Sequence, residues 1–271
     1  MDVIIFGGQS NMQGQAEKRL WDTPVQNAWE YKYLQDTAVP LADPAGENIT
    51  YELTAGNAIH DDSEIADWLK RHVLGAACYD RATLVPAFCD TYVKETGREV
   101  LAVHAAKGST QVHDWLPGTP GFDALVAKSR GALRYAAGHG GVGHVDFVWL
   151  QGESDAIFQV TETQYAERIR LLCAALREAP GIEHFGIIRV GRFTKDERDL
   201  QIMAAQERVC REDEAFVMLT DIAEQLNSDP EAMNPNIGGH FGAVGLERLG
   251  KAAGAALAAL REEKTAMPDP E

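Results

Sequence analysis

The chain has 271 residues, 45% of them hydrophobic, which is enough for one sizeable core, and we expect a single domain over residues 1–262. The 25 Lys and Arg against 41 Asp and Glu give a formal net charge of −16, which disfavours nucleic acid or an anionic membrane as a partner. Because no run of eighteen apolar residues and no signal-peptide pattern is present, the sequence predicts a cytoplasmic protein, or a secreted one if a leader was removed.

The four cysteines, Cys78, Cys89, Cys173 and Cys210, are widely spaced and contain no CxxC pair. This spacing indicates neither a zinc site nor a disulfide scaffold, and we expect buried thiols. No other cluster of residues has the spacing of metal ligands, so the sequence predicts no metal and no cofactor.

The first strand ends in a candidate catalytic turn. The apolar run 2–7 leads directly into Gly-Gln-Ser-Asn-Met-Gln-Gly at 8–14. A turn with glycines on both sides can hold one small side chain at the edge of a sheet, where open α/β sheets bind their ligands. Ser10 is therefore a candidate nucleophile, although the turn alone fits a polar loop without chemistry equally well.

Residues 15–62 break the regular pattern and predict a long insertion at the ligand end of the sheet. Its aromatic residues are Trp21, Trp29, Tyr31, Tyr33 and Tyr51. Their rings have two interpretations, as the lining of a cleft for sugar rings or as anchors that hold a long loop on the core.

The rest of the chain alternates between helical and strand patterns. Helical spacing covers 84–97, 121–137, 162–178, 195–211 and 242–262, and apolar strand runs cover 100–105, 145–150, 185–190 and 216–220. With the first strand, this alternation predicts an α/β fold of three layers, a doubly wound parallel five-stranded sheet in the order 2-1-3-4-5 between helices. The polar tail 263–271 is expected to be frayed.

Three strand ends and one late loop converge in this topology. The first strand ends at Ser10, the second at Gly108, and the third at Gln151-Gly-Glu-Ser-Asp. The loop contains His240, which follows two glycines and precedes the last helix. A lone histidine is usually a surface residue, but this setting can present an imidazole at the edge of the sheet.

These blocks carry a resemblance. GQSNM at 8–12, AAKGST at 105–110 with Trp115 downstream, QGESD at 151–155, and a late histidine followed by FGAVGLERLG resemble the SGNH hydrolase superfamily. Within it they are most similar to carbohydrate esterase family six and the sialate O-acetylesterase-like proteins. The likeness covers about 1–15 and 84–260, and the four blocks in this order are specific together, although each is weak alone.

The resemblance implies an SGNH-type, flavodoxin-like fold and a serine esterase that removes O-acetyl groups from a carbohydrate of the acetylxylan or sialate type. By position, Ser10 corresponds to the nucleophile and His240 to the general base. The backbone N–H groups of Ser10 and Gly108 and the Gln151 amide correspond to oxyanion-hole donors, which suits the charge that develops in acyl transfer.

One position departs from the family pattern. Many superfamily members carry an aspartate three residues before the histidine, where this chain has Ile237. Glu153 of the QGE block matches the acid that some family-six esterases use, and Asp221 and Asp229 are alternatives. A Ser-His pair without an acid also remains open.

Two further questions stay open at this level. The apolar Ile237 leaves a catalytically silent carbohydrate-binding or structural protein as the alternative function, although the other site residues favour an enzyme. Arg189 and Arg192, at the end of the fourth strand, are candidates to bind a substrate carboxylate, as in sialate, and Trp115 is a further candidate substrate contact. The sugar and the oligomeric state are not predicted.

Overall fold

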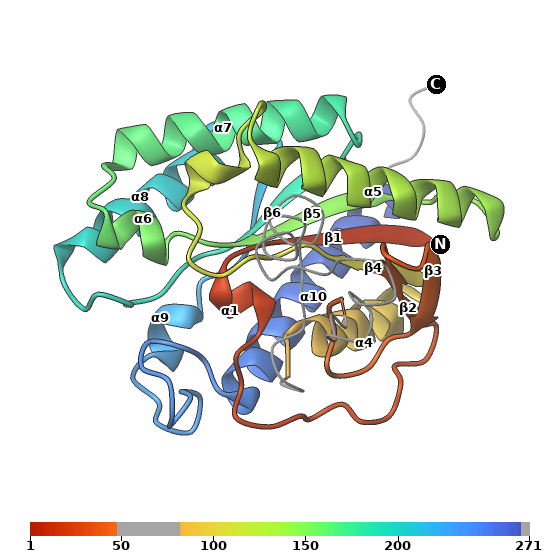
Figure 1. Ribbon diagram of the computed structural model, residues 1–271, viewed down its shortest axis with the longest axis horizontal. Coiled ribbons are helices and arrows are strands. Elements are labelled where there is room, and N and C mark those ends of the chain that lie inside the picture. Colours follow the sequence, from red (N-terminus) through yellow and green to blue (C-terminus); the bar gives the residue numbers. More distant parts are fainter. Residues whose placement is uncertain (48–81, 267–271) are drawn as a thin grey trace, which may run out of the picture.

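The computed structural model describes residues 1–47 and 82–266, which build one sheet of seven strands in the order β3-β2-β4-β1-β5-β6-β7 (Figure 1). The strands are β1 (Asp2–Gly8), β2 (Ala28–Lys32), β3 (Thr37–Pro40), β4 (Val100–His104), β5 (Val145–Leu150), β6 (His184–Ile188) and β7 (Phe216–Thr220). All neighbours are parallel except β3, which runs antiparallel to β2. The predicted α/β class and the order of the five predicted strands are confirmed.

The predicted count of five strands is wrong, because β2 and β3 come from the predicted insertion 15–62. The strand β2 contains charged residues, so it does not form the continuous apolar run from which the other strands were predicted. Glu30 and Lys32 are both buried, and the Lys32 ammonium lies 2.7 Å from Glu30 Oε2. Glu30 Oε1 also accepts a hydrogen bond of 2.7 Å from the Gly46 amide. Burial of these charges is tolerated because each has a partner.

The aromatic residues of this segment hold it on the core. Tyr31 is 1% exposed, and its hydroxyl donates to Asp36 over 2.7 Å. Trp21, Trp29 and Tyr33 are partly buried and pack against the same core. Tyr51 and residues 48–62 lie outside the described residues. The described aromatics therefore follow the second of the two interpretations, as anchors of the segment.

Helices cover both faces of the sheet. They are α1 (Ser10–Gln13), α4 (Val85–Thr96), α5 (Pro120–Gly138), α6 (Glu153–Ile157), α7 (Glu162–Glu178), α8 (Glu197–Glu212), α9 (Ala223–Leu226) and α10 (Ala243–Ala266), with a short 3₁₀ helix η1 at Val112–Trp115. In Figure 1, α5, α7 and α8 lie on one side of the sheet and α4 and α10 on the other. This arrangement buries β1, β4 and β5 on both faces, which explains their continuous apolar sequences.

The predicted helices lie within about two residues of the observed ones at most ends. The main difference is at the last helix: α10 continues to Ala266, so residues 263–266 are helical where a frayed tail was predicted. Cys89 and Cys173 are buried free thiols, Cys210 is partly buried, and Cys78 lies outside the described residues.

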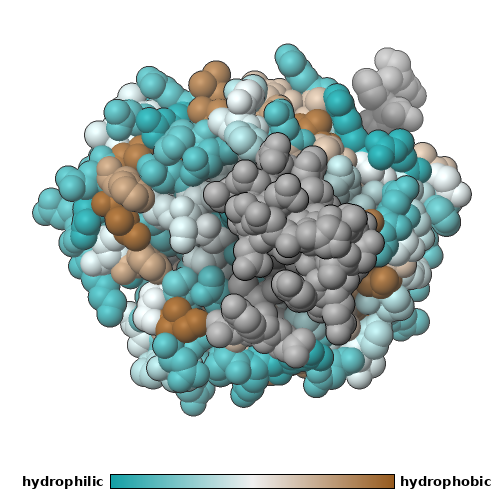
Figure 2. Space-filling view, in the orientation of Figure 1, coloured by the Kyte–Doolittle hydropathy of each residue, from teal (hydrophilic) through white to brown (hydrophobic). Residues whose placement is uncertain are grey.

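The surface in the view of Figure 2 is mostly hydrophilic, with small scattered apolar areas. The exposed large apolar side chains of the described residues are Leu20, Val142, Ile157, Phe158, Leu171 and Leu200. None of the described helices combines the length and apolar character that crossing a bilayer requires.

Candidate active site

Ser10 lies where β1 turns into α1. The turn requires Gly8, which has a φ of +139° and lies so close to the Leu150 carbonyl of β5 that a Cβ atom would overlap it. Gln9 then donates its backbone N–H to the same carbonyl over 3.1 Å. These contacts fix the start of α1 at the carboxyl end of β1, and Ser10 occupies its first position, 6% exposed.

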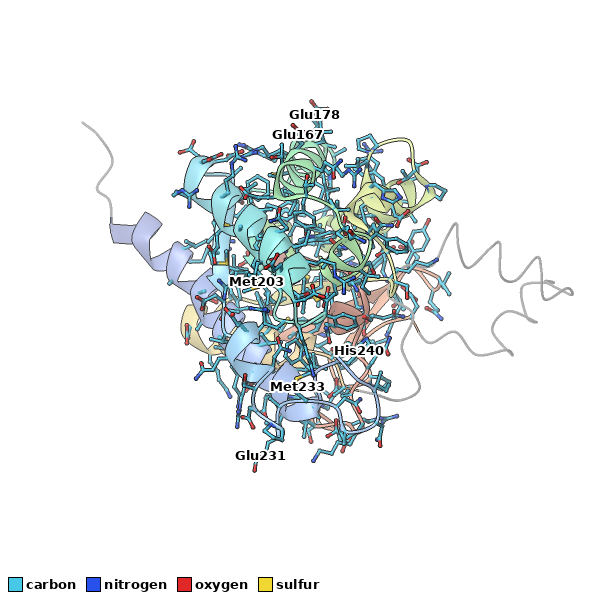
Figure 3. The ribbon with its side chains drawn as sticks, turned by 90° about the vertical axis from the view of Figure 1, so that its left-hand side faces the viewer. Glu167, Glu178, Met203, Glu231, Met233 and His240 are labelled. Atoms are coloured by element: carbon cyan, nitrogen blue, oxygen red, sulfur yellow. The ribbon has the colours of Figure 1, made fainter. Side chains whose placement is uncertain are left out.

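His240 meets this serine from the opposite end of the chain. It lies in the loop between α9 and α10, shown with Met233 in Figure 3. Its Nε2 atom lies 2.9 Å from Ser10 Oγ. The structure thus brings together two predicted site residues that are 230 positions apart.

The second imidazole nitrogen contacts a backbone carbonyl. His240 Nδ1 lies 2.9 Å from the Gly238 oxygen. A carbonyl oxygen can only accept, so Nδ1 carries the hydrogen and Nε2 presents its lone pair to the Ser10 hydroxyl. This is the tautomer that a general base for the serine needs, and no carboxylate is required to select it.

Glu153 does not contact the imidazole, which differs from the predicted role as its acid partner. Its Oε1 accepts a hydrogen bond of 2.7 Å from Asn11 Nδ2, and Asn11 Oδ1 accepts one of 3.1 Å from the Phe241 amide. Glu153 therefore reaches the histidine loop only through the side chain of Asn11. Burial raises the pKa of the Glu153 carboxyl, and the Asn11 hydrogen bond opposes that rise.

The alternative acids are also not at the imidazole. Asp229 Oδ2 lies 2.5 Å from Arg248 Nη1, and this pairing holds the pKa of Asp229 below its usual value. The backbone oxygen of Asp221 accepts from Arg189 over 3.4 Å. Within residues 1–47 and 82–266, the imidazole of His240 contacts Ser10, Gly238 and Phe193.

Gly108 lies beside the serine, as predicted. A Cβ atom placed on Gly108 would be 3.5 Å from Ser10 Cβ. Its backbone N–H donates to Gln13 Oε1 over 2.8 Å. Ser10 itself is the first residue of α1, where backbone N–H groups have no acceptor within the helix. The two predicted backbone donors thus lie close to the Ser10 side chain.

Gln151 has a different place from the one predicted. Its side chain is fully buried, and Nε2 donates within a network of Gln9 Oε1 at 3.1 Å, the Thr110 oxygen at 2.9 Å and Asp155 Oδ2 at 2.5 Å. Since the amide has two hydrogens and these acceptors use both, none is left for a bound oxyanion. Gln151 instead joins Gln9 and Thr110 through its hydrogen bonds.

The Gln151 network includes a carboxyl with a shifted pKa. Asp155 Oδ2 also accepts from the Val112 amide over 2.9 Å, which ties α6 to η1. Burial raises the pKa of Asp155 to about 6, although its hydrogen bonds from Gln151 and Val112 lower it.

Three contacts fix the histidine loop on the segment that follows the serine. The Phe241 amide bonds to Asn11, the Ala243 amide donates to Glu17 Oε2 over 3.0 Å, and Asn234 Nδ2 donates to the backbone oxygen of Gln15. The Phe193 ring adds an edge-to-face contact with the imidazole, with ring centroids 5.7 Å apart. The loop is therefore held on both sides of the imidazole.

The predicted substrate contacts lie elsewhere. Trp115 is 1% exposed and packs edge-to-face on Trp149 in the core, which corrects its assignment as a substrate contact. Arg189 is 9% exposed and pairs with Glu207 and Glu224. Its guanidinium is thus already neutralised by two carboxylates.

Arg192 is half-buried and lies within 4 Å of two carboxylates. Its Nε is 3.7 Å from Asp199 Oδ2 and its Nη1 is 3.9 Å from Glu224 Oε1. A substrate carboxylate at Arg189 or Arg192 would have to displace these partners, so neither arginine is preformed for that role.

Sequence reasoning missed four functional neighbours: Asn11, Gln13, Phe193 and the Gly238 carbonyl. Gln13 lies three residues after Ser10 in the glycine-flanked block, so its proximity to Ser10 follows from the spacing of one helical turn, whereas Asn11 lies only one residue after Ser10 and has no such signal. A main-chain carbonyl has no residue type of its own, and no sequence signal marks Gly238.

Comparisons with known proteins show the fold and the family of this chain. No curated protein matches the chain. Among solved structures, a protein from Arabidopsis thaliana and NanS each have a TM-score of 0.64, 15% identity, and coverage of 96% of this chain and 98% of theirs. A carbohydrate acetylesterase from Xanthomonas citri has a TM-score of 0.50 and 14% identity, covering 93% of this chain and 55% of its own. These similarities show a shared fold.

The family itself is given by a sequence model. Residues 1–258 match the family described as carbohydrate esterase, sialic acid-specific acetylesterase. That span includes all four sequence blocks and both members of the Ser10–His240 pair. The chain therefore belongs to the sialic acid-specific acetylesterase family of carbohydrate esterases.

Proposed function

We propose that Ser10 is the nucleophile and His240 the general base in the removal of O-acetyl groups from a carbohydrate through an acetyl-enzyme. The observation that carries this proposal is the 2.9 Å contact between Ser10 Oγ and His240 Nε2, in the tautomer that leaves Nε2 as acceptor. The family membership supports the substrate class, and the contact between the two side chains supports their assignment.

The reaction follows from the positions of these groups. Ser10 Oγ attacks the acetyl carbonyl carbon, and its proton passes to His240 Nε2. The negative oxygen of the tetrahedral intermediate accepts hydrogen bonds from the backbone N–H groups of Ser10 and Gly108. When the intermediate collapses, the sugar oxygen leaves with the proton from Nε2, and water then attacks the acetyl-serine with His240 again as base.

The Gly238 carbonyl takes the orienting part that an acid has in a Ser-His-Asp triad. It accepts a hydrogen bond from Nδ1 with 2.9 Å between the nitrogen and oxygen atoms, which supports a Ser-His dyad as the working unit. Glu153 is proposed as a positioning residue that acts through Asn11 on the histidine loop. The Gln151 side chain, whose amide hydrogens are engaged, is proposed as support for Gln9 and Thr110.

The first test uses 4-nitrophenyl acetate and the variants Ser10→Ala and His240→Ala. Each is expected to lower kcat by several orders of magnitude, and the double variant should be little worse than either, because a nucleophile and its base fail together. His139→Ala is the matched control, since His139 is exposed at the end of α5 and stacks on Tyr135. Losses that multiply in the double variant would contradict the pair.

The second test concerns the sugar. Acetate release from O-acetylated sialic acid, acetylated xylan and acetylated glucosamine should be compared at equal acetyl concentration. The family description puts the sialate first. The ratio of kcat/KM values then identifies the class of acetylated sugar that the enzyme prefers. Hydrolysis of 4-nitrophenyl acetate without acetate release from any of the three sugars would contradict a carbohydrate substrate.

A further inference from the structure

The Gln13 side chain occupies space next to the nucleophile. Ser10 and Gln13 are three residues apart on α1, so their side chains share one face of the helix. Gln13 Oε1 accepts the Gly108 N–H at 2.8 Å and would lie 3.2 Å from a Cβ atom placed on Gly108, while Ser10 Cβ would lie 3.5 Å away. The glutamine oxygen, the Gly108 amide and the serine side chain therefore meet in one small volume.

We propose that Gln13 is a built-in ligand of the oxyanion hole, whose side-chain oxygen holds the Gly108 N–H until the acyl oxygen displaces it. The proposal rests on the function proposed above. An N–H group has one hydrogen and binds its acceptor at about 2.9 Å along one direction. An acyl oxygen that takes this hydrogen must enter the space that Gln13 Oε1 fills, so the two cannot be bound at full strength together.

The Gly108 turn does not need Gln13 to hold its shape. The Lys107 amide donates to the Gly8 oxygen over 2.9 Å, which ties the turn to β1. Thr110 Oγ1 donates to the Lys107 oxygen over 2.8 Å, and the Thr110 oxygen accepts from Gln151 over 2.9 Å. Because the turn is anchored on both sides of Gly108, the glutamine contact acts on the amide hydrogen rather than on the fold of the turn.

Binding of an acyl group then exchanges one hydrogen bond for another. A typical net hydrogen bond corresponds to a factor of about two to ten in an equilibrium constant. Gln13→Ala removes the internal acceptor, so a ligand that needs the Gly108 N–H should bind about two- to tenfold more tightly. If Gln13 instead donated to the oxyanion, the same variant would bind that ligand more weakly.

Phenylboronic acid is a suitable probe of this site. Ser10 Oγ donates an electron pair to the trigonal boron, its proton passes to His240 Nε2, and the resulting tetrahedral boronate carries a negative charge like the intermediate. Titration calorimetry on the whole protein gives its Kd for the parent and for each variant. Ser10→Ala is expected to abolish this binding.

Gln13→Glu provides a second, opposite variant. It keeps the size and the acceptor but places a negative charge beside the boronate, so affinity is expected to fall below that of the parent near neutral pH. The loss relative to the parent at each pH should diminish on acidification as the introduced carboxylate is protonated. A merely structural role for Gln13 would not reverse sign between the two variants.

The outcomes separate the inference from the proposed function. Tighter boronate binding by Gln13→Ala supports the inference, and equal or weaker binding overturns it. Boronate binding that survives Ser10→Ala overturns the proposed function. Amide hydrogen exchange at Gly108 needs no ligand and should be faster in Gln13→Ala; unchanged exchange overturns the inference whatever the boronate result.

Discussion

At the scale of single residues, His240 is oriented by main-chain geometry. The Gly238 oxygen accepts a hydrogen bond from Nδ1 with 2.9 Å between the two atoms. The imidazole is therefore oriented although the side chain three residues before it, Ile237, cannot accept a hydrogen bond. A neutral carbonyl selects the tautomer but stabilises the imidazolium of the reaction less than a carboxylate does.

At this scale the sequence indicated which residues meet at Ser10 but not the main-chain partner of the imidazole. The structure places Ser10, Gly108 and His240 together. The sequence marks each of them, because Ser10 stands between Gly8 and Gly14, Gly108 is itself a glycine in a turn, and His240 follows two glycines. The sequence pointed to Glu153 as the partner of the imidazole, because residue types identify candidate side chains and not main-chain acceptors. The actual partner of Nδ1 is the backbone of Gly238, which any residue type could supply.

Glu153→Gln is expected to keep kcat within about tenfold of the parent, whereas loss of a true triad acid can cost about ten-thousandfold. The glutamine oxygen still accepts from Asn11, and no charge is removed from contact with the imidazole. Steady-state kinetics with 4-nitrophenyl acetate measure this.

Asn11→Ala is the comparison for that variant. It removes both the Glu153 bond and the Phe241 bond, so it is expected to lower kcat more than Glu153→Gln does. A Glu153→Gln enzyme with a loss of several thousandfold would show that Glu153 reaches the imidazole during turnover and would contradict the dyad.

At the scale of elements, the apolar strands buried on both faces were predictable and the charged strand β2 was not. The segments 100–105 and 145–150 are continuous apolar runs and coincide with β4 and β5. β2 contains Glu30 and Lys32, whose burial is offset by their ion pair and by the hydrogen bonds of both side chains to the Gly46 backbone. Such pairing depends on the tertiary environment, which cannot be read from the spacing of apolar residues in the sequence.

Glu17→Ala is expected to weaken the attachment of α10 to the serine segment. Glu17 Oε2 accepts from the Ala243 amide at the first position of α10, and removal of a helix cap costs about 0.5–2 kcal/mol. The urea concentration at the unfolding midpoint and kcat should both fall modestly. Glu231→Ala is the control, since Glu231 is exposed in the loop before α10. Equal effects of the two variants would contradict the cap.

Asp155 gives a pH dependence that belongs to the α6–η1 junction. Its folded pKa of about 6 lies above the unfolded value of about 3.9, so its stabilising contribution is present below pH 4 and is lost as pH rises through 6. The free energy of unfolding of the parent relative to Asp155→Asn should therefore rise from pH 7 to pH 4, on the order of 2–3 kcal/mol.

Urea unfolding of the parent and Asp155→Asn at pH 4, 5, 6 and 7 measures this difference directly. Only the difference between the two proteins is interpreted, because other groups titrate in both. A constant difference over this range would contradict the raised pKa of Asp155.

At the scale of the whole molecule, polar clusters lie at both ends of the parallel strands. The candidate site lies at their carboxyl ends. At the amino ends, Arg98 and Tyr92 donate to the buried Asp2, and Arg261 of α10 bonds to Tyr92 and to Asp146 of β5. Burial alone would raise the pKa of Asp2, but its hydrogen bonds lower it overall. The N-terminal strand, α4, β5 and the last helix are thereby joined at one place.

The position of α10 also depends on close approach of its backbone to α4. Gly250 lies against the Leu84 carbonyl and Gly254 against the Phe88 carbonyl, so that a Cβ atom at either glycine would overlap main-chain atoms of α4. These contacts set the path of the helix whose first turn follows His240. The packing of two helices at the back of the sheet thus contributes to where the imidazole lies at its edge.

Gly254→Ala tests this coupling. Alanine raises helix propensity by up to about 1 kcal/mol, but overlap with the Phe88 main chain is expected to cost about 1–3 kcal/mol, so the variant should unfold at lower urea concentration. Gly138→Ala is the matched control, because Gly138 ends α5 with no atom within 4 Å of the added Cβ, and it should be neutral or slightly stabilising. Since any outward shift of α10 moves the histidine loop, kcat should fall in Gly254→Ala and stay unchanged in Gly138→Ala. A Gly254→Ala protein as stable and active as the parent would show that the two helices can separate without cost and that α10 packing does not position His240.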